Sequence, residues 1–162
     1  MKPVRNLMMA AMFGLAATVV TAPVMQAYAE TPPNMLVIAN RIDDITTLDP
    51  QESFEFAGAD VIRNVYGKLV NFNPLDLNAG YEPDLAESWE GSEDGKTITF
   101  KMRAGVKFES GNPVTAKDAE FSLRRAVTLN KTPSFILTQF GFTADNVEDT
   151  IVATDDMTLV IK

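Results

Sequence analysis

The sequence contains no cysteine and no histidine among its 162 residues. Without cysteine there can be no disulfide, no thiolate metal site and no lipid attached through a cysteine. The two absences together exclude Ser-His-Asp and Cys-His catalytic sites and zinc sites with nitrogen or sulfur ligands. No serine is followed by lysine three positions later, and no G-x-S-x-G sequence occurs. We therefore expect no nucleophilic hydrolase, no metal and no cofactor.

Basic residues are also scarce, since 14 Lys and Arg stand against 22 Asp and Glu, for a net charge of −8. Nucleic-acid binding is not expected, because phosphate backbones are held by clustered Lys and Arg. The acids leave two-carboxylate glycoside chemistry open, but no pair is distinguished by its spacing. Asp43, Asp44 and Asp49 lack the spacing of a calcium loop and are interpreted as loop acids. The DGKT sequence at 94–97 lacks the upstream glycine of a phosphate-binding loop and indicates a hairpin turn.

The first 29 residues have the pattern of a cleaved signal peptide. Lys2 and Arg5 precede an uncharged apolar run at 7–20, and Ala27 and Ala29 fit the small-x-small cleavage pattern. The alternative is a membrane anchor, but the run is shorter than the ~20 residues needed to span a bilayer. We expect a soluble protein of the periplasm, cleaved near Ala29 and not a lipoprotein.

The first half of the remaining chain predicts short elements of both kinds. The apolar run at 35–39 indicates a buried strand, followed by a polar loop at 40–50. Apolar residues at helical spacing predict a helix at 57–66 that ends at Gly67. A short strand at 69–72 and a loop at 73–82 are expected next.

Two hairpins are predicted from alternating patterns. Residues 97–103 alternate between apolar and polar and pair with 85–90 across a turn at Asp94 and Gly95, with Trp89 as the large buried candidate. The runs 150–154 and 158–162 form the second hairpin. The chain stops inside its last strand, which is typical of a fragment of a longer protein.

A longer helix is predicted between the hairpins. Thr115 caps it, with Asp118 in capping-box position, and Gly111 and Pro113 break the chain before it. One face is apolar, and Glu120 and Arg124 on the other form an ordinary surface ion pair. The members of the apolar face are Ala119, Leu123, Ala126 and Val127. Residues 133–142 are predicted as a short helix or an inserted loop.

A series of residues along the mature chain resembles one protein family. These are Leu48, Asp49, Pro50, Pro83, Leu85, Ala86, Glu87, Ser88, Trp89, Asp94, Gly95, Lys96, Thr97, Thr99, Phe100, Arg103, Gly105, Val106, Lys107, Phe108, Gly111, Pro113, Val114, Thr115, Ala116, Asp118, Phe121, Ser122 and Arg125, with the strand entry at 157–162. The pattern is similar to that of the extracytoplasmic solute-binding proteins of peptide and nickel ABC transporters, family 5.

The resemblance implies a mixed α/β fold, the N-terminal part of a two-lobed periplasmic-binding-protein-like fold of type II. Residues 30–50 would supply the first strand and loop of lobe I, and 51–162 its small accessory domain, with the second lobe missing. Ser53, Phe54, Glu55 and Phe56 would line the ligand cleft, and Ser134 is a weaker candidate. The alternative for Phe54 and Phe56 is a place in the core on one face of a short strand.

The function that the resemblance implies is that of a binding protein, not an enzyme. It would capture di- or oligopeptides in the extracytoplasmic space, as a monomer, and deliver them to a membrane permease of an ABC importer. The same fold binding nickel chelate, opine or oligosaccharide is one alternative. A secreted enzyme or structural module built on the accessory domain is an alternative of another class.

Overall fold

The computed structural model describes residues 31–162, so the predicted signal peptide lies outside the described residues. The chain divides into two compact units after Ile38. The part of the first unit that is described, 31–38, has a turn but no helix or strand, and Leu36 is 83% exposed. The strand predicted at 35–39 is wrong. None of the strand pairings among residues 31–162 includes it, and an unpaired strand has no partner for its backbone groups.

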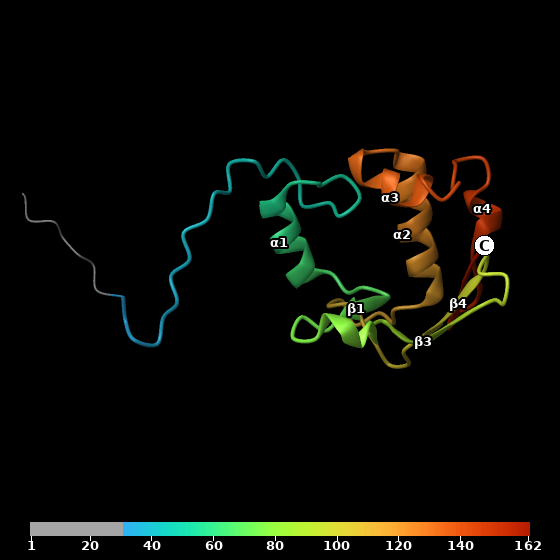
Figure 1. Ribbon diagram of the computed structural model, residues 1–162, viewed down its shortest axis with the longest axis horizontal. Coiled ribbons are helices and arrows are strands. Elements are labelled where there is room, and N and C mark those ends of the chain that lie inside the picture. The colour runs from blue at the N-terminus through green and yellow to red at the C-terminus, as the bar shows by residue number, and fades with distance from the viewer. Residues whose placement is uncertain (1–30) are drawn as a thin grey trace, which may run out of the picture. The chain divides into compact units, whose positions relative to one another are not determined.

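A four-stranded antiparallel sheet is the centre of residues 39–162 (Figure 1). Its order is β3-β4-β6-β5, with the bounds Ala86–Gly91, Ile98–Met102, Thr158–Ile161 and Ile151–Asp155. Both predicted hairpins are confirmed. Gly95 has φ +68° in the first turn and donates its N–H to the Ser92 carbonyl at 2.9 Å. Glycine adopts this left-handed conformation without steric cost, which explains the turn.

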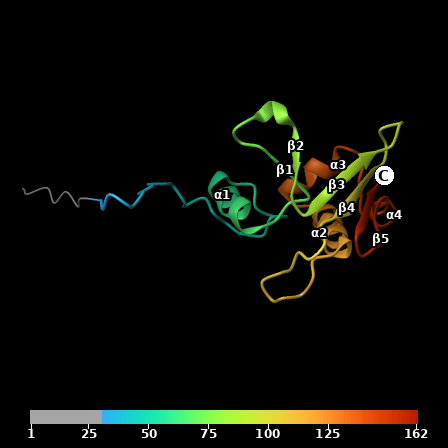
Figure 2. The ribbon, with the colours of Figure 1, turned by 90° about the horizontal axis from the view of Figure 1, so that it is seen from below.

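The core lies between this sheet and helix α2 (Ala116–Leu129), which covers one face of it (Figure 2). The buried cluster comprises Ala86, Phe100, Met102, Ala116, Val127, Val147, Ile151 and Leu159. Ala119 and Leu123 pack against this cluster, so the predicted apolar face of the helix is confirmed. The mixed α/β class predicted from the sequence is confirmed as well.

Trp89 is 37% exposed, so the prediction that it is buried is wrong. It lies opposite Phe100 in the register, on the face of the sheet that carries the core. However, β3 is an edge strand, and α2 contacts β5 and β6, which lie toward the opposite edge of the sheet. Alternation identifies the face on which a side chain lies, but it does not show how far the covering helix extends.

Shorter elements complete the unit. Helix α1 (Phe56–Val65) confirms the helix predicted at 57–66 to within a residue. The expected loop at 73–82 contains a short 3-10 helix, η1 (Leu77–Ala79), and the start of β2 (Tyr81–Pro83), which pairs with β1 (Val70–Phe72). The remaining pieces are η2 (Thr132–Ser134), α3 (Phe135–Thr138) and α4 (Val147–Thr150). The first two confirm the helical alternative for 133–142. Within the described part of the chain, no helix combines the length and apolar character needed to cross a membrane.

Gly67 does not end α1 as predicted. Gly67 is not among the positive-φ positions; the helix ends at Val65, and its C-cap residue Tyr66 has an extended conformation. A Cβ added at Gly67 would lie 3.0 Å from three carbons of Leu85, so the missing side chain makes room for Leu85. The glycine at this position is therefore explained by close packing against Leu85 and not by the end of the helix.

The capping box of α2 is confirmed, whereas its ion pair is more than a surface pair. The N–H and hydroxyl of Thr115 donate to the Asp118 carboxylate at 2.7 and 2.8 Å. Glu120 and Arg124 lie 2.8 Å apart, and both are mostly buried. Glu120 accepts the Ala153 N–H at 3.0 Å, and Arg124 donates to the Ile151 carbonyl at 2.8 Å. The pair therefore satisfies free backbone groups of edge strand β5, which the spacing alone did not predict.

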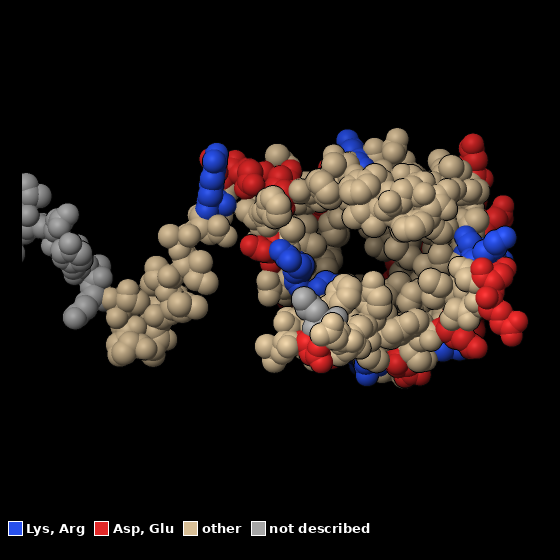
Figure 3. Space-filling model, in the orientation of Figure 1, with Lys and Arg blue, Asp and Glu red and all other residues tan. Residues whose placement is uncertain are grey.

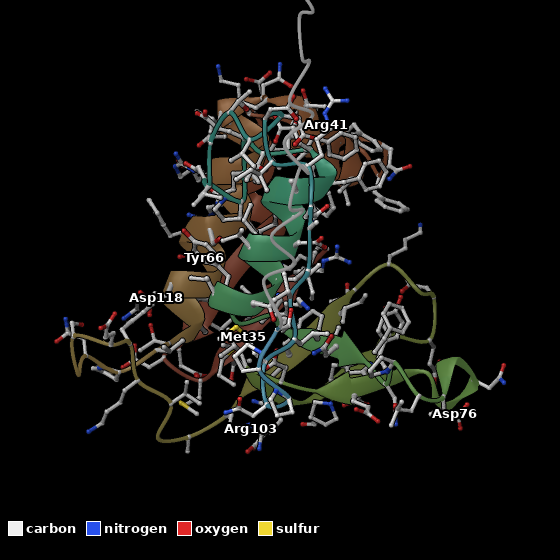
Figure 4. All side chains as sticks on the ribbon, turned by 90° about the vertical axis from the view of Figure 1, so that its left-hand side faces the viewer. Met35, Arg41, Tyr66, Asp76, Arg103 and Asp118 are labelled. Atoms are coloured by element: carbon white, nitrogen blue, oxygen red, sulfur yellow. The ribbon has the colours of Figure 1, made fainter. Side chains whose placement is uncertain are left out.

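A cavity of about 840 Å³ lies between the end of α1, β1 and α2, and Figure 3 shows the hollow. Its wall is largely apolar and includes Val65, Leu69, Leu85 and Leu123. Figure 4 shows two further wall residues, Tyr66 at the end of α1 and Asp118 in α2.

Candidate functional site

The loop that precedes the predicted ligand segment is anchored to α2. Arg125 holds the Asp49 carboxylate with two hydrogen bonds of 3.0 and 2.7 Å, and it also donates to the side chain of Gln51. Gln51 in turn donates to the carbonyl and hydroxyl of Ser122 at 3.0 and 2.8 Å. The Arg125 guanidinium, followed by the Gln51 backbone N–H, lowers the pKa of Asp49. The Leu-Asp-Pro motif is therefore a structural clamp.

The Glu55 carboxylate organises the predicted ligand segment itself. It accepts hydrogen bonds from the Thr46 hydroxyl at 2.7 Å, the Ser53 hydroxyl at 2.9 Å and the Phe54 N–H at 3.1 Å. The Thr46 hydrogen bond is the largest cause that lowers the pKa of Glu55 from 4.5 to about 2. Because its oxygens are engaged inside the loop, Glu55 positions the segment.

Ser53 is buried, and Gly58 allows its position. A Cβ on Gly58 would lie 2.5 Å from the Ser53 hydroxyl oxygen, which is closer than Cβ atoms in proteins approach a non-bonded atom. The side chains of Ser53 and Glu55 are therefore engaged within the loop. Phe54 and Phe56 are 55% and 89% exposed. The alternative that these two rings belong to the core on one face of a strand is wrong, because Phe56 begins α1 and both rings are exposed.

The loop around Glu55 should contribute a specific pH dependence. A carboxyl group whose pKa is lowered by folding stabilises the protein above its unfolded pKa, and this stabilisation is lost as the pH falls through the folded value. We expect the stabilisation from Glu55 to be complete above pH 4.5 and to disappear toward pH of about 2. The Glu55→Gln variant should therefore be less stable than the wild type at neutral pH, and the two should converge in acid. Urea unfolding across this range measures the difference, and a difference independent of pH would contradict the assignment.

The backbone of the segment retains an unused acceptor. Among residues 31–162, no N–H or hydroxyl donates to the carbonyl oxygens of Ser53 and Phe54, whereas the Glu55 carbonyl accepts the Ala59 N–H at 2.9 Å. Phe54 as a residue is 55% exposed. A sequence cannot show this feature, because it depends on where α1 begins.

The structure brings the second candidate segment next to the first, but through a different residue. Ser134 is buried, and its hydroxyl donates to the Asn130 side chain at 3.2 Å. Its neighbour Phe135 instead meets Phe54, with ring centroids 5.5 Å apart at an interplanar angle of 84°. Sequence reasoning missed Phe135, although its place beside Ser134 in an apolar run was a usable signal.

Two cavities of the described chain lie apart from the Phe54–Phe135 contact. The 840 Å³ cavity has none of residues 53–56 in its wall and is bounded mainly by apolar side chains. A shallower one of about 500 Å³ lies where Asp49 and Gln51 meet α2, but these polar groups bind Arg125 and Ser122. Within 31–162 no cluster of three or more acidic, His or Cys residues is arranged to hold a metal.

Comparison with known proteins identifies the family. The model of "Bacterial extracellular solute-binding proteins, family 5 Middle" matches residues 80–162, about half of the chain. The probable D,D-dipeptide-binding periplasmic protein DdpA of Escherichia coli is 35% identical over 111 residues, 67% of this chain and 21% of that protein. The periplasmic oligopeptide-binding protein OppA of Salmonella typhimurium is 30% identical over 139 residues, 85% of this chain and 24% of that protein. The chain thus spans about a quarter or less of the length of these relatives.

Solved structures show the same fold. The murein tripeptide binding protein MppA of Escherichia coli matches with a TM-score of 0.62 and 28% identity, over 72% of this chain and 24% of that one. The protein MoaA of A. tumefaciens R10, solved with mannopinic acid, matches with a TM-score of 0.58 and 35% identity, over 74% and 23%.

These matches confirm the resemblance that the sequence motifs indicated, and with it the expectation of a binding protein instead of an enzyme. The family model covers the hairpin β3-β4, the capped helix α2 and the hairpin β5-β6, which carry most of those motifs. The chain belongs to the bacterial extracellular solute-binding proteins of family 5.

Proposed function

We propose that this protein is the substrate-binding component of an ABC importer that captures di- or oligopeptides in the periplasm. It delivers them, as a monomer, to a membrane permease. The predicted signal peptide and the periplasmic relatives support the location. Residues 30–50 supply the start of lobe I in this proposal, and residues 51–162 supply its accessory domain.

The observation that carries the proposal is the carbonyl of the exposed residue Phe54, to which no residue of the range 31–162 donates a hydrogen bond. An extended peptide displays a row of N–H donors that is the same for every sequence, and pairing with them gives affinity without side-chain selection. The Asp49–Arg125 clamp and the Glu55 hydrogen bonds hold this carbonyl in place before any ligand arrives. A fixed acceptor costs less conformational entropy on binding than a mobile one.

The test is titration calorimetry on the product of the complete reading frame with trialanine. Analogues in which each peptide bond in turn is an ester are the matched ligands, because an ester removes one N–H donor without adding bulk. We expect trialanine to bind and one ester to bind roughly tenfold more weakly, as the loss of a hydrogen bond predicts. Absence of trialanine binding, or equal affinity for all the esters, would contradict the proposal.

An opine is the second candidate ligand. The structure of MoaA in complex with mannopinic acid shares 35% identity with this chain, against 28% for MppA. Mannopinic acid should therefore be titrated in the same experiment. Saturable binding of this compound without binding of trialanine would favour an opine-binding protein.

A further inference from the structure

The two aromatic rings beside the free carbonyl form a defined surface. Phe54 and Phe135 meet edge to face at 5.5 Å, and they are 55% and 48% exposed. Each ring therefore contacts the other while about half of its surface is open. The two come from segments about eighty residues apart, at the start of α1 and the start of α3.

The chain that carries each ring is held in place by hydrogen bonds of its backbone and of neighbouring residues. Glu55 accepts the Phe54 N–H at 3.1 Å, and Ser53, next to Phe54, donates its N–H to the Asp49 carbonyl at 2.9 Å. On the other side, Ser134 is fixed by Asn130, which ends α2 at φ +50°. The surface is thus preorganised, and little side-chain entropy remains to be lost when a ligand packs on it.

The two chain segments that carry this pair hold few charged residues. The thirteen residues 132–144 contain no Asp, Glu, Lys or Arg, although the chain has 36 charged residues in 162. Figure 3 shows a broad uncharged surface over α3. The only charged residue in the segment 53–56 is Glu55, whose carboxylate is engaged by three donors of the loop. A charged ligand group placed here would lose water and gain no oppositely charged partner from residues 53–56 or 132–144.

We propose that the Phe54–Phe135 pair is a side-chain subsite that selects an uncharged apolar or aromatic side chain of the bound peptide. This inference rests on the proposed peptide-binding function and adds to it the class of side chain. An incoming ring can extend the edge-to-face arrangement, which adds affinity beyond that gained from the burial of its area. Phe54 thus supplies both the backbone acceptor and one ring of the side-chain subsite.

The test is calorimetry on the product of the complete reading frame with four peptides: Ala-Phe-Ala, Ala-Leu-Ala, Ala-Asp-Ala and Ala-Lys-Ala. We expect the Phe and Leu peptides to bind roughly tenfold or more tightly than the Asp and Lys peptides. Equal affinity for all four would overturn the subsite and leave the proposed function intact. Binding of none of them would overturn both.

Variants locate the preference on the ring pair. Phe135→Ala should weaken the binding of Ala-Phe-Ala by about threefold to tenfold. Phe135→Leu retains apolar bulk, so it should weaken the binding of Ala-Phe-Ala less and leave the affinity for Ala-Leu-Ala unchanged. Phe72→Ala is the matched control, because Phe72 is 51% exposed and also pairs with an aromatic ring, that of Tyr81, at 4.5 Å. Thermal unfolding checks that each variant is folded. Loss of the preference in Phe72→Ala, or its survival in both folded Phe135 variants, would overturn the assignment.

Discussion

Replacement of Leu159 by alanine should lower the free energy of unfolding by about 2 to 5 kcal/mol, the range for a large buried side chain. Leu159 is fully buried on the inner strand β6 and lies opposite Phe100 and Ala153 in the register. Truncation there leaves a cavity under α2 that the surrounding strands cannot close without losing their hydrogen bonds. Urea unfolding of the mature chain, followed by circular dichroism, measures the effect.

Trp89→Ala is the matched comparison in the same sheet. The side chain is larger than that of leucine, yet it is 37% exposed on edge strand β3. Trp89→Ala should therefore lower the free energy of unfolding by less than Leu159→Ala does, and by less than the ~3 kcal/mol lower bound for a buried tryptophan. If Trp89→Ala destabilised the protein more than Leu159→Ala, the core described here would be misplaced.

Residues 30–162 by themselves should bind peptides at least about a hundredfold more weakly than the product of the complete reading frame. Ligand sites of high affinity enclose most of the ligand surface, and two-lobed binding proteins achieve this by closing around it. In the proposed function, the Phe54 carbonyl and the Phe54–Phe135 pair would contact a ligand from one side, and the chain spans 24% of OppA. Parallel titrations of one peptide into both proteins give the ratio. Saturable micromolar binding by the short chain would show that it contains a complete site.

The sequence predicted the parts of the fold whose signals are local. The hairpins followed from alternation and a turn glycine, and α2 followed from its capping box and apolar face. Three features depended on distant partners and were predicted wrongly. The run 35–39 could form a strand only beside a neighbouring strand, and Trp89 could be buried only under a covering helix. The glycine at position 67 is explained only by its contact with Leu85.

The candidate site shows the same division. The segment 53–56 was predicted from the Leu-Asp-Pro motif that precedes it, but which of its side chains point inward depends on Thr46 and Gly58. Ser134 is hydrogen-bonded to Asn130, whereas its neighbour Phe135 contacts Phe54. The Phe54–Phe135 contact joins positions far apart in the sequence, and no local pattern predicts such a pair.

The most direct test of the central claim is mass spectrometry of the ligand that co-purifies with the product of the complete reading frame from the periplasm. We predict di- or oligopeptides of mixed sequence, enriched in apolar and aromatic side chains and released on unfolding. Recovery of an opine, an oligosaccharide or a nickel chelate in place of peptides would contradict the account.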